Sequence, residues 1–119
     1  MHFDLWVPGK PKTKGRPRFT KSGRTYTPKE TLAEEARIAQ AYREADGPLF
    51  LGAVTVDVTY YTDGQWIALN DHQDASPLRG DIDNYLKLTL DALQGDECPA
   101  FANDKAVVQL RGLKRAARG

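Results

Sequence analysis

The sequence contains one cysteine and no long apolar segment. Cys98 has no second cysteine to pair with, so an internal disulfide is excluded and a reducing cytosol fits the chain. No apolar run approaches the roughly 20 residues of a membrane span. The N-terminus also lacks the apolar core of a signal peptide. These absences predict a cytoplasmic protein without a membrane segment.

Histidine is also scarce, and the sequence offers no Ser-His-Asp or Cys-His arrangement for nucleophilic catalysis. We interpret His72 as a solvated loop residue and Cys98 as a packing residue. Trp66 fits a core position, a dimer contact or a base-stacking group equally well. No internal repeat or linker divides the 119 residues, which predicts a single domain over residues 1–119, and we expect no organic cofactor.

Acidic residues are missing from residues 10–24, although the net charge of the whole chain is only +1. The cations of this stretch are Lys10, Lys12, Lys14, Arg16, Arg18, Lys21 and Arg24. Its proline and glycine content predicts an exposed loop or short hairpin at residues 10–26, which we call the basic arm. An idle surface usually mixes both signs, so the arm is predicted to neutralise DNA phosphates. The alternative is a lysine-rich solvated loop.

The spacing of apolar residues predicts three strands and two helices. In chain order, the expected elements are a strand at residues 2–7, a helix at 28–45, a strand at 53–61, a helix at 82–94 and a strand at 106–113. Residues 62–80 show no periodic signal and are interpreted as a long polar loop. This β-α-β-α-β order predicts a small α/β protein of the α+β type, in which two helices cover one face of a mixed sheet. A basic tail follows at residues 114–119.

Local signals support these boundaries. Thr27, Pro28 and Glu30 have the spacing of a capping box at the start of the first helix. In the second strand, apolar residues such as Val56 alternate with polar ones, which predicts one buried and one wetter face. Gly95 is a natural end for the second helix.

Asp81 and Asp83 stand where the polar loop becomes the second helix. Two helical residues at i and i+2 point about 200° apart. The two carboxylates can therefore face the same way only if Asp81 precedes the helix and Asp83 lies in its first turn. Two ionised carboxylates this close repel each other unless a cation neutralises them, and hard oxygen ligands suit Mg²⁺ or Mn²⁺. The alternative is that they serve as helix caps.

A third ligand has to come from farther along the chain. Asp91 lies about 12 Å along the helix from Asp83, too far to share a metal, and is expected to pair with Lys87 one turn away. Asp104 is the better candidate. The nine residues from 95 to 103 can span up to about 30 Å, more than the roughly 16 Å that the helix travels from Asn84 to Gln94. We therefore expect Asp104 to return to the start of the helix.

Taken together, these motifs resemble the RusA family of Holliday junction resolvases. The resemblance rests on Asp81-Ile82-Asp83-Asn84-x-x-Lys87, Asp91-Ala92-Leu93, Gly95, Asp104 before Val107-Val108, and the basic segment from Pro8 to Arg18. It implies a homodimeric, Mg²⁺-dependent endonuclease that cuts four-way DNA junctions by paired, symmetrical nicks in recombination and repair. Asp81, Asp83 and Asp104 match the essential acids of the family, Lys87 matches a catalytic lysine, and Asn84 belongs to the same motif.

The sequence departs from the family pattern at three positions. Many members carry an acidic pair where this chain has Asn103 and Asp104, and often a glutamine in place of Ala106. Gly80 replaces a frequent proline. Two other functions stay open: a non-catalytic module that binds structured DNA, and a small metal-dependent nuclease that acts on flaps or single strands. A phage or prophage origin is suggested because many members are encoded there.

Overall fold

The computed structural model describes residues 1–15, 18–73, 76–94 and 100–118; of Arg18 only the backbone is described. Arg16, Gly95 and Cys98, singled out above, lie outside the described residues. The chain forms two compact units, residues 1–73 and residues 74–119. The first contains a sheet, a hairpin and a long helix, and the second contains the helix that follows Asp81.

The first unit is built on a three-stranded antiparallel sheet. Its strands are β1 (His2–Pro8), β4 (Val54–Tyr61) and β5 (Gly64–Asp71), with β5 in the middle. A tight connection joins β4 to β5, and every residue of β1 pairs with a residue of β5. The central strand is therefore the one that holds the sheet together.

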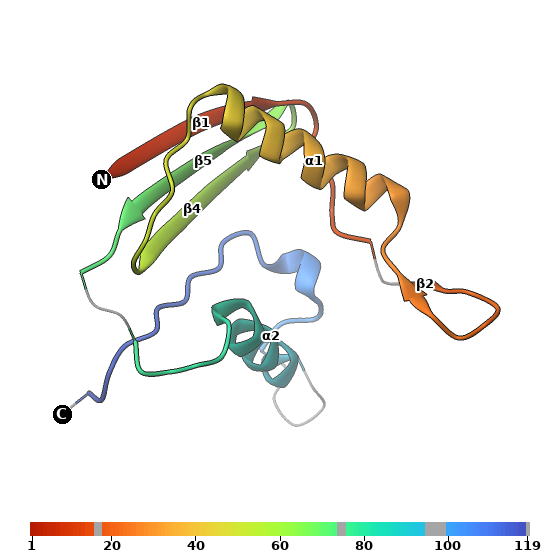
Figure 1. Ribbon diagram of the computed structural model, residues 1–119. Coiled ribbons are helices and arrows are strands. Elements are labelled where there is room, and N and C mark those ends of the chain that lie inside the picture. The colour runs from red at the N-terminus through yellow and green to blue at the C-terminus, as the bar shows by residue number, and fades with distance from the viewer. Residues whose placement is uncertain (16–17, 74–75, 95–99, 119) are drawn as a thin grey trace. The chain divides into compact units, whose positions relative to one another are not determined.

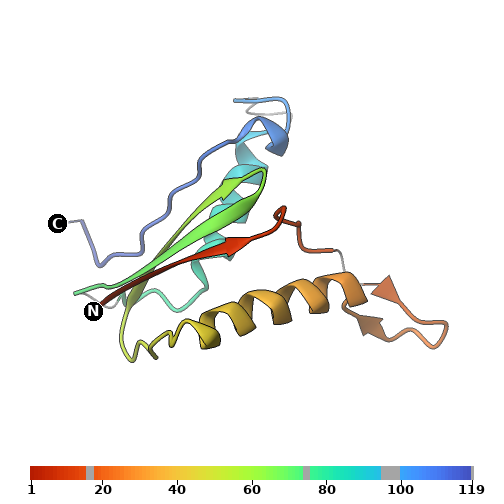
Figure 2. The same ribbon diagram turned by 90° about the horizontal axis from the view of Figure 1, so that it is seen from above.

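Helix α1 (Lys29–Glu44) covers one face of this sheet beside β1 (Figures 1 and 2). Leu5 and Val7 are buried on that face, and the ring of Phe3 meets the edge of Tyr42 with 5.2 Å between centroids. The cover stops short of β4, where Val56 remains 55% exposed. The buried face predicted for this strand is thus only partly formed, because α1 packs beside β1 and β4 is the strand at the other edge of the sheet.

An aromatic cluster occupies the other face of the sheet. Trp6 and Trp66 face each other across β1 and β5, with ring centroids 6.5 Å apart, and Tyr61 lies 5.7 Å from Trp6. Gly64 leaves room for the Trp6 indole, because a Cβ at this position would run into the ring. Both tryptophans keep more than a third of their surface exposed, at 38% and 41%.

A short hairpin precedes α1 and extends past its N-terminal end (Figures 1 and 2). It consists of β2 (Arg18–Phe19) and β3 (Thr25–Tyr26), joined by a turn in which Gly23 has a φ of 85°. Left-handed backbone of this kind favours glycine. For the described residues of 10–26, the prediction of an exposed loop or short hairpin is confirmed.

The second unit contains α2 (Ile82–Leu93) and a short 3₁₀ turn, η1 (Asp104–Ala106). After η1 the chain runs back beside α2. Gly112 lies against Leu86, where a Cβ on the glycine would come within 3.0 Å of the leucine side chain. Farther on, the Ser76 hydroxyl donates to the Arg115 carbonyl. Within the described residues, neither helix is long and apolar enough to cross a membrane.

The α+β class, the small sheet and the two helices are confirmed, but four details differ from the prediction. The sheet is antiparallel, not mixed, and β5 lies inside the predicted loop at residues 62–80. The strand expected at 106–113 is absent; η1 and irregular chain take its place. Helix α1 begins after Pro28 without a side-chain cap, so the capping box with Thr27 and Glu30 does not form.

Candidate functional site

Asp81 and Asp83 stand at the start of α2, as the sequence predicted. Asp81 has extended backbone, with φ −69° and ψ 140°, and Asp83 lies in the first turn. The Asp81 carbonyl accepts hydrogen bonds from the backbone N–H groups of Asn84 and Tyr85, at 3.1 and 3.3 Å. The helix therefore begins immediately after Asp81, and its backbone is capped without help from the two carboxylates.

The side chains of Asp81 and Asp83 are available to bind a ligand. Asp81 makes no side-chain capping bond, so the capping alternative does not hold for this residue. Both side chains are exposed, and neither is hydrogen-bonded or ion-paired to another residue that the structure describes. A helix N-terminus carries a partial positive charge, which makes it a favourable place for carboxylates. Two unpaired carboxylates at one end of a helix suit a hard divalent cation.

Two residues outside the acidic motif hold the chain ahead of Asp81. The Tyr85 hydroxyl accepts a hydrogen bond of 3.2 Å from the Gly80 N–H, and a Cβ on Gly80 would meet the tyrosine ring at 2.8 Å. The Lys114 ammonium donates to the carbonyls of Gly80, at 3.0 Å, and Leu78, at 3.4 Å. Lys114 was predicted to belong to a basic tail. No local sequence signal points to its position beside α2.

Asp104 does not return to the start of α2, and this expectation is corrected. Its carboxylate accepts a hydrogen bond from the side-chain amide of Gln94, the residue that ends α2. The Ala100 N–H also donates to the Leu93 carbonyl, at 2.6 Å, and Asn103 caps η1 by accepting from the Lys105 N–H at 2.7 Å. These bonds keep the chain at the C-terminal end of the helix. In the described part of the molecule, no three acidic, histidine or cysteine side chains gather closely enough to hold a metal ion.

The other polar residues of the motif lie exposed on α2. These are Asn84, Lys87 and Asp91. Lys87 and Asp91 form no ion pair with each other or with any other described residue, so the expected brace between them is absent. Lys87 follows Asp83 by four residues and therefore rises from the same side of the helix.

The basic arm lies in the first unit. Lys10, Lys12 and Lys14 are exposed along the segment that follows β1, and Lys21 and Arg24 are exposed in the hairpin turn. The described part of this stretch contains no acidic side chain, so its positive charges are not neutralised from within. The arm offers a row of cations to a polyanion such as DNA.

Comparison with known protein families gives a match over most of the sequence. The family model described as "Endodeoxyribonuclease RusA" matches residues 8–118 of the 119. The chain belongs to the RusA family. The resemblance inferred from the acidic motif and the basic arm is thus confirmed. No curated protein and no solved structure matches the chain significantly.

The RusA match extends across both compact units and includes every predicted site residue. The basic arm begins just inside the matched region, and the acidic motif and Asp104 lie well within it. RusA proteins are endodeoxyribonucleases, so the family assigns this chain to the hydrolases that cut DNA.

Proposed function

We propose that the chain is a Mg²⁺-dependent endonuclease that resolves four-way DNA junctions by paired, symmetrical nicks during recombination and repair. The observation that carries the proposal is the RusA family match together with two free carboxylates at the start of α2. A bound metal ion can activate water for attack on a phosphate, and the sequence offers no Ser-His-Asp or Cys-His arrangement as an alternative.

Asp81 and Asp83 would hold the magnesium ion, and Mn²⁺ would substitute for it. Mg²⁺ is commonly bound by one or two carboxylates together with waters and substrate phosphate oxygens, so this pair fits the ion. When bound, the ion lowers the pKa of a coordinated water and stabilises negative charge on phosphate oxygens. Lys87 would contact the same phosphate and stabilise its charge. The family pattern adds Asp104 as a third carboxylate.

The basic arm would bind the DNA backbone. Each lysine or arginine that neutralises a phosphate releases counterions, which makes affinity depend on salt. We also propose a homodimer. A four-way junction is nearly two-fold symmetric, and two symmetrical nicks require two active sites related in the same way.

A nicking assay on a mobile four-way junction tests this function. We expect paired nicks with Mg²⁺ and none with EDTA. Asp83→Asn should abolish cleavage while leaving junction binding intact or stronger, because one negative charge near the DNA is removed. The control is Asp57→Asn, which makes the same change on an exposed residue of β4.

The other outcomes identify the alternatives. Binding of the junction without cleavage in Mg²⁺ would support a DNA-binding module. Cleavage of flaps or single strands but not junctions would support a different nuclease. If Asp83→Asn cuts at the normal rate, the proposed metal site is wrong.

A further inference from the structure

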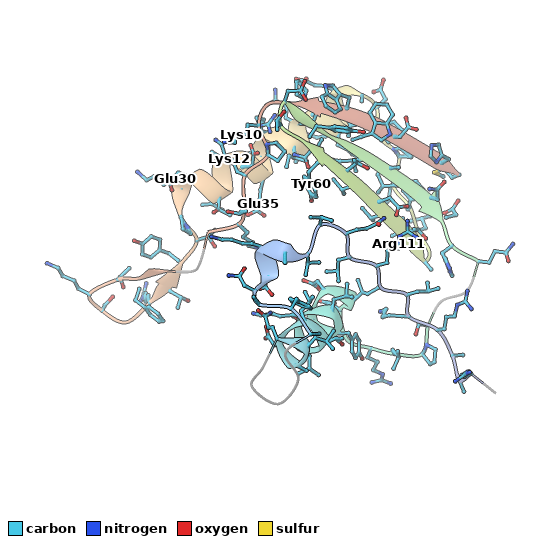
Figure 3. All side chains as sticks on the ribbon, turned by 180° about the vertical axis from the view of Figure 1, so that it is seen from behind. Lys10, Lys12, Glu30, Glu35, Tyr60 and Arg111 are labelled. Atoms are coloured by element: carbon cyan, nitrogen blue, oxygen red, sulfur yellow. The ribbon has the colours of Figure 1, made fainter. Side chains whose placement is uncertain are left out.

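The first part of the basic arm, which carries Lys10, Lys12 and Lys14, is bonded to α1 on both sides. Before it, the Arg37 guanidinium donates to the Pro8 carbonyl, two residues ahead of Lys10. After it, the Gly15 N–H donates to the Thr31 hydroxyl at 3.0 Å. Figure 3 shows Lys10 and Lys12 on the segment between these anchors, where the chain passes α1. The segment that carries three lysines is therefore not a free loop.

The anchors lie on one side of the helix. Thr31, Glu34 and Arg37 are three residues apart, and such residues are neighbours on a helix surface. The arm passes from Arg37 toward Thr31 and so runs antiparallel to α1. The two outer anchors are about 9 Å apart along the axis, whereas the six arm residues between them could extend to roughly 20 Å. Both ends are thus tied to a short, rigid support.

Glu34 holds Arg37 in place. The carboxylate accepts two hydrogen bonds from the guanidinium, from Nε at 2.6 Å and from Nη2 at 3.0 Å. The third nitrogen of the fork is then directed to Pro8. Hydrogen bonding to Arg37 holds the pKa of Glu34 below its ordinary value, and the carboxylate raises the pKa of Arg37 in turn. Planar, two-point pairs of this kind fix geometry as well as charge.

The position of Glu34 is unfavourable if the arm acts only through its charge. Glu34 is 9% exposed, and the positive charge of Lys12 is a minor cause of its lowered pKa, after the hydrogen bonding to Arg37. A carboxylate here subtracts from the positive field that would attract phosphates. Its contribution is geometric, because it orients the guanidinium that holds the start of the arm.

We propose that Glu34 and Arg37 are positioning residues that hold the basic arm against α1 and present Lys10, Lys12 and Lys14 to DNA as a fixed row. The inference rests on the proposed function, in which the arm binds phosphates. A segment that is ordered before binding loses less conformational entropy when it binds, and this raises affinity.

Two substitutions that change the charge of α1 equally distinguish the effect of holding the arm in position from the effect of charge alone. Glu34→Gln and Glu35→Gln each remove one negative charge from α1. Glu35 is exposed and has no bonded partner among the described residues. The amide introduced by Glu34→Gln would place an N–H₂ donor against the donors of the guanidinium and break the two-point pair. We expect Glu34→Gln to weaken junction binding about tenfold. Glu35→Gln should leave it unchanged or slightly stronger.

Three further measurements test position directly. Trypsin should cut the Lys12–Thr13 and Lys14–Gly15 bonds faster in Glu34→Gln than in Glu35→Gln. A segment released from α1 can adopt the conformation that binds in the protease active site. In cleavage assays, Glu34→Gln should raise KM and leave kcat unchanged, since the acidic residues on α2 are not altered. Fluorescence of Trp6 and Trp66, the two tryptophans of the chain, checks that the sheet is folded.

If Glu34→Gln fails to fold, Arg37→Lys gives the same test, because it keeps the charge and loses the planar fork. Equal affinity of the Glu34→Gln and Glu35→Gln proteins, with equal trypsin sensitivity, would overturn the positioning role. The double variant Lys12→Ala/Lys14→Ala tests the arm itself. If it binds DNA normally, DNA binding by the arm is wrong. If it binds weakly while Glu34→Gln binds normally, only the positioning role is wrong.

Discussion

The Lys114 ammonium donates a hydrogen bond of 3.0 Å to the Gly80 carbonyl, one residue ahead of Asp81. This bond ties the last part of the chain to the start of α2. Together with the Tyr85 hydroxyl, it fixes the backbone that leads into the helix. The entry to α2 is therefore held by groups other than the two carboxylates, and this leaves Asp81 and Asp83 free.

We predict that Lys114→Ala loosens the start of α2. The substitution removes a charged donor from two carbonyls, and hydrogen bonds to charged groups contribute about 1.5–3 kcal/mol. Because Lys114 is half-buried and partly solvated, we expect about 1–2 kcal/mol of local stability to be lost. Amide exchange of Asn84 and Tyr85 should then become roughly 5- to 30-fold faster in NMR. Lys105→Ala, at an exposed lysine of the same segment, should leave both rates unchanged. Equal rates in the two variants would contradict this role.

The start of α2 could be predicted because its signals are local. The apolar stripe of the helix and the spacing of Asp81 and Asp83 locate the start of α2 from neighbouring residues alone. The partners of that boundary are not local. Lys114 reaches Gly80 only because the chain after η1 runs back along α2, and no neighbouring residue encodes that path. The same reason explains the misplacement of Asp104, whose position depends on the bond with Gln94.

Strand β5 was missed because it is the middle strand of the sheet. It carries apolar residues on both faces: Trp66 and Ala68 on one, Ile67 and Leu69 on the other. A strand of this kind lacks the alternation of apolar and polar residues by which half-buried strands are recognised. Residues 106–113 give the opposite error. Their alternation resembles a strand, but a strand also requires a hydrogen-bonded partner, and the described residues provide none.

Gly64→Ala should destabilise the sheet. The added Cβ would run into the Trp6 ring and come within 2.8 Å of the Val7 carbonyl oxygen, and this backbone atom cannot move aside as a flexible side chain can. Overpacking of this kind costs about 1–3 kcal/mol. Urea unfolding followed by tryptophan fluorescence should show the loss, because both tryptophans lie in this cluster. Gly52→Ala is the control; its Cβ would meet nothing within 4 Å, and we expect a change below about 0.5 kcal/mol. A normal midpoint for Gly64→Ala would contradict this packing.

His2 should titrate above its ordinary pKa. Its ring is hydrogen-bonded to Asp4 and to Asn70, and both bonds raise the pKa of His2 above 6.5, with Asp4 the larger cause. Because the folded value is raised, this contribution to stability is fully present below pH 6.5 and is lost as the pH rises through the folded pKa. An NMR titration of the ring should show Asp4→Asn moving the midpoint down, while Asp57→Asn leaves it in place. An unchanged midpoint in Asp4→Asn would contradict the assigned cause.

Asp104 provides a decisive test of the acidic site, because its family role and its observed partner lead to different results. In the structure its carboxylate is bonded to Gln94 at the far end of α2, about 18 Å along the axis from the start of the helix. If Asp104 serves only to hold Gln94, then Asp104→Asn and Gln94→Leu should have the same small effect on stability and none on cleavage. If it supplies the third carboxylate, the bond with Gln94 has to break when the metal and DNA bind. We expect the second result, which requires Asp104 to leave the position that it has in the structure. Asp104→Asn should slow junction cleavage more than about 100-fold, beyond the effect of losing a residue that only supports a ligand. Gln94→Leu, which frees the carboxylate, should cut at least at the parent rate. Normal cleavage by Asp104→Asn would leave Asp81 and Asp83 as the only carboxylates of the site.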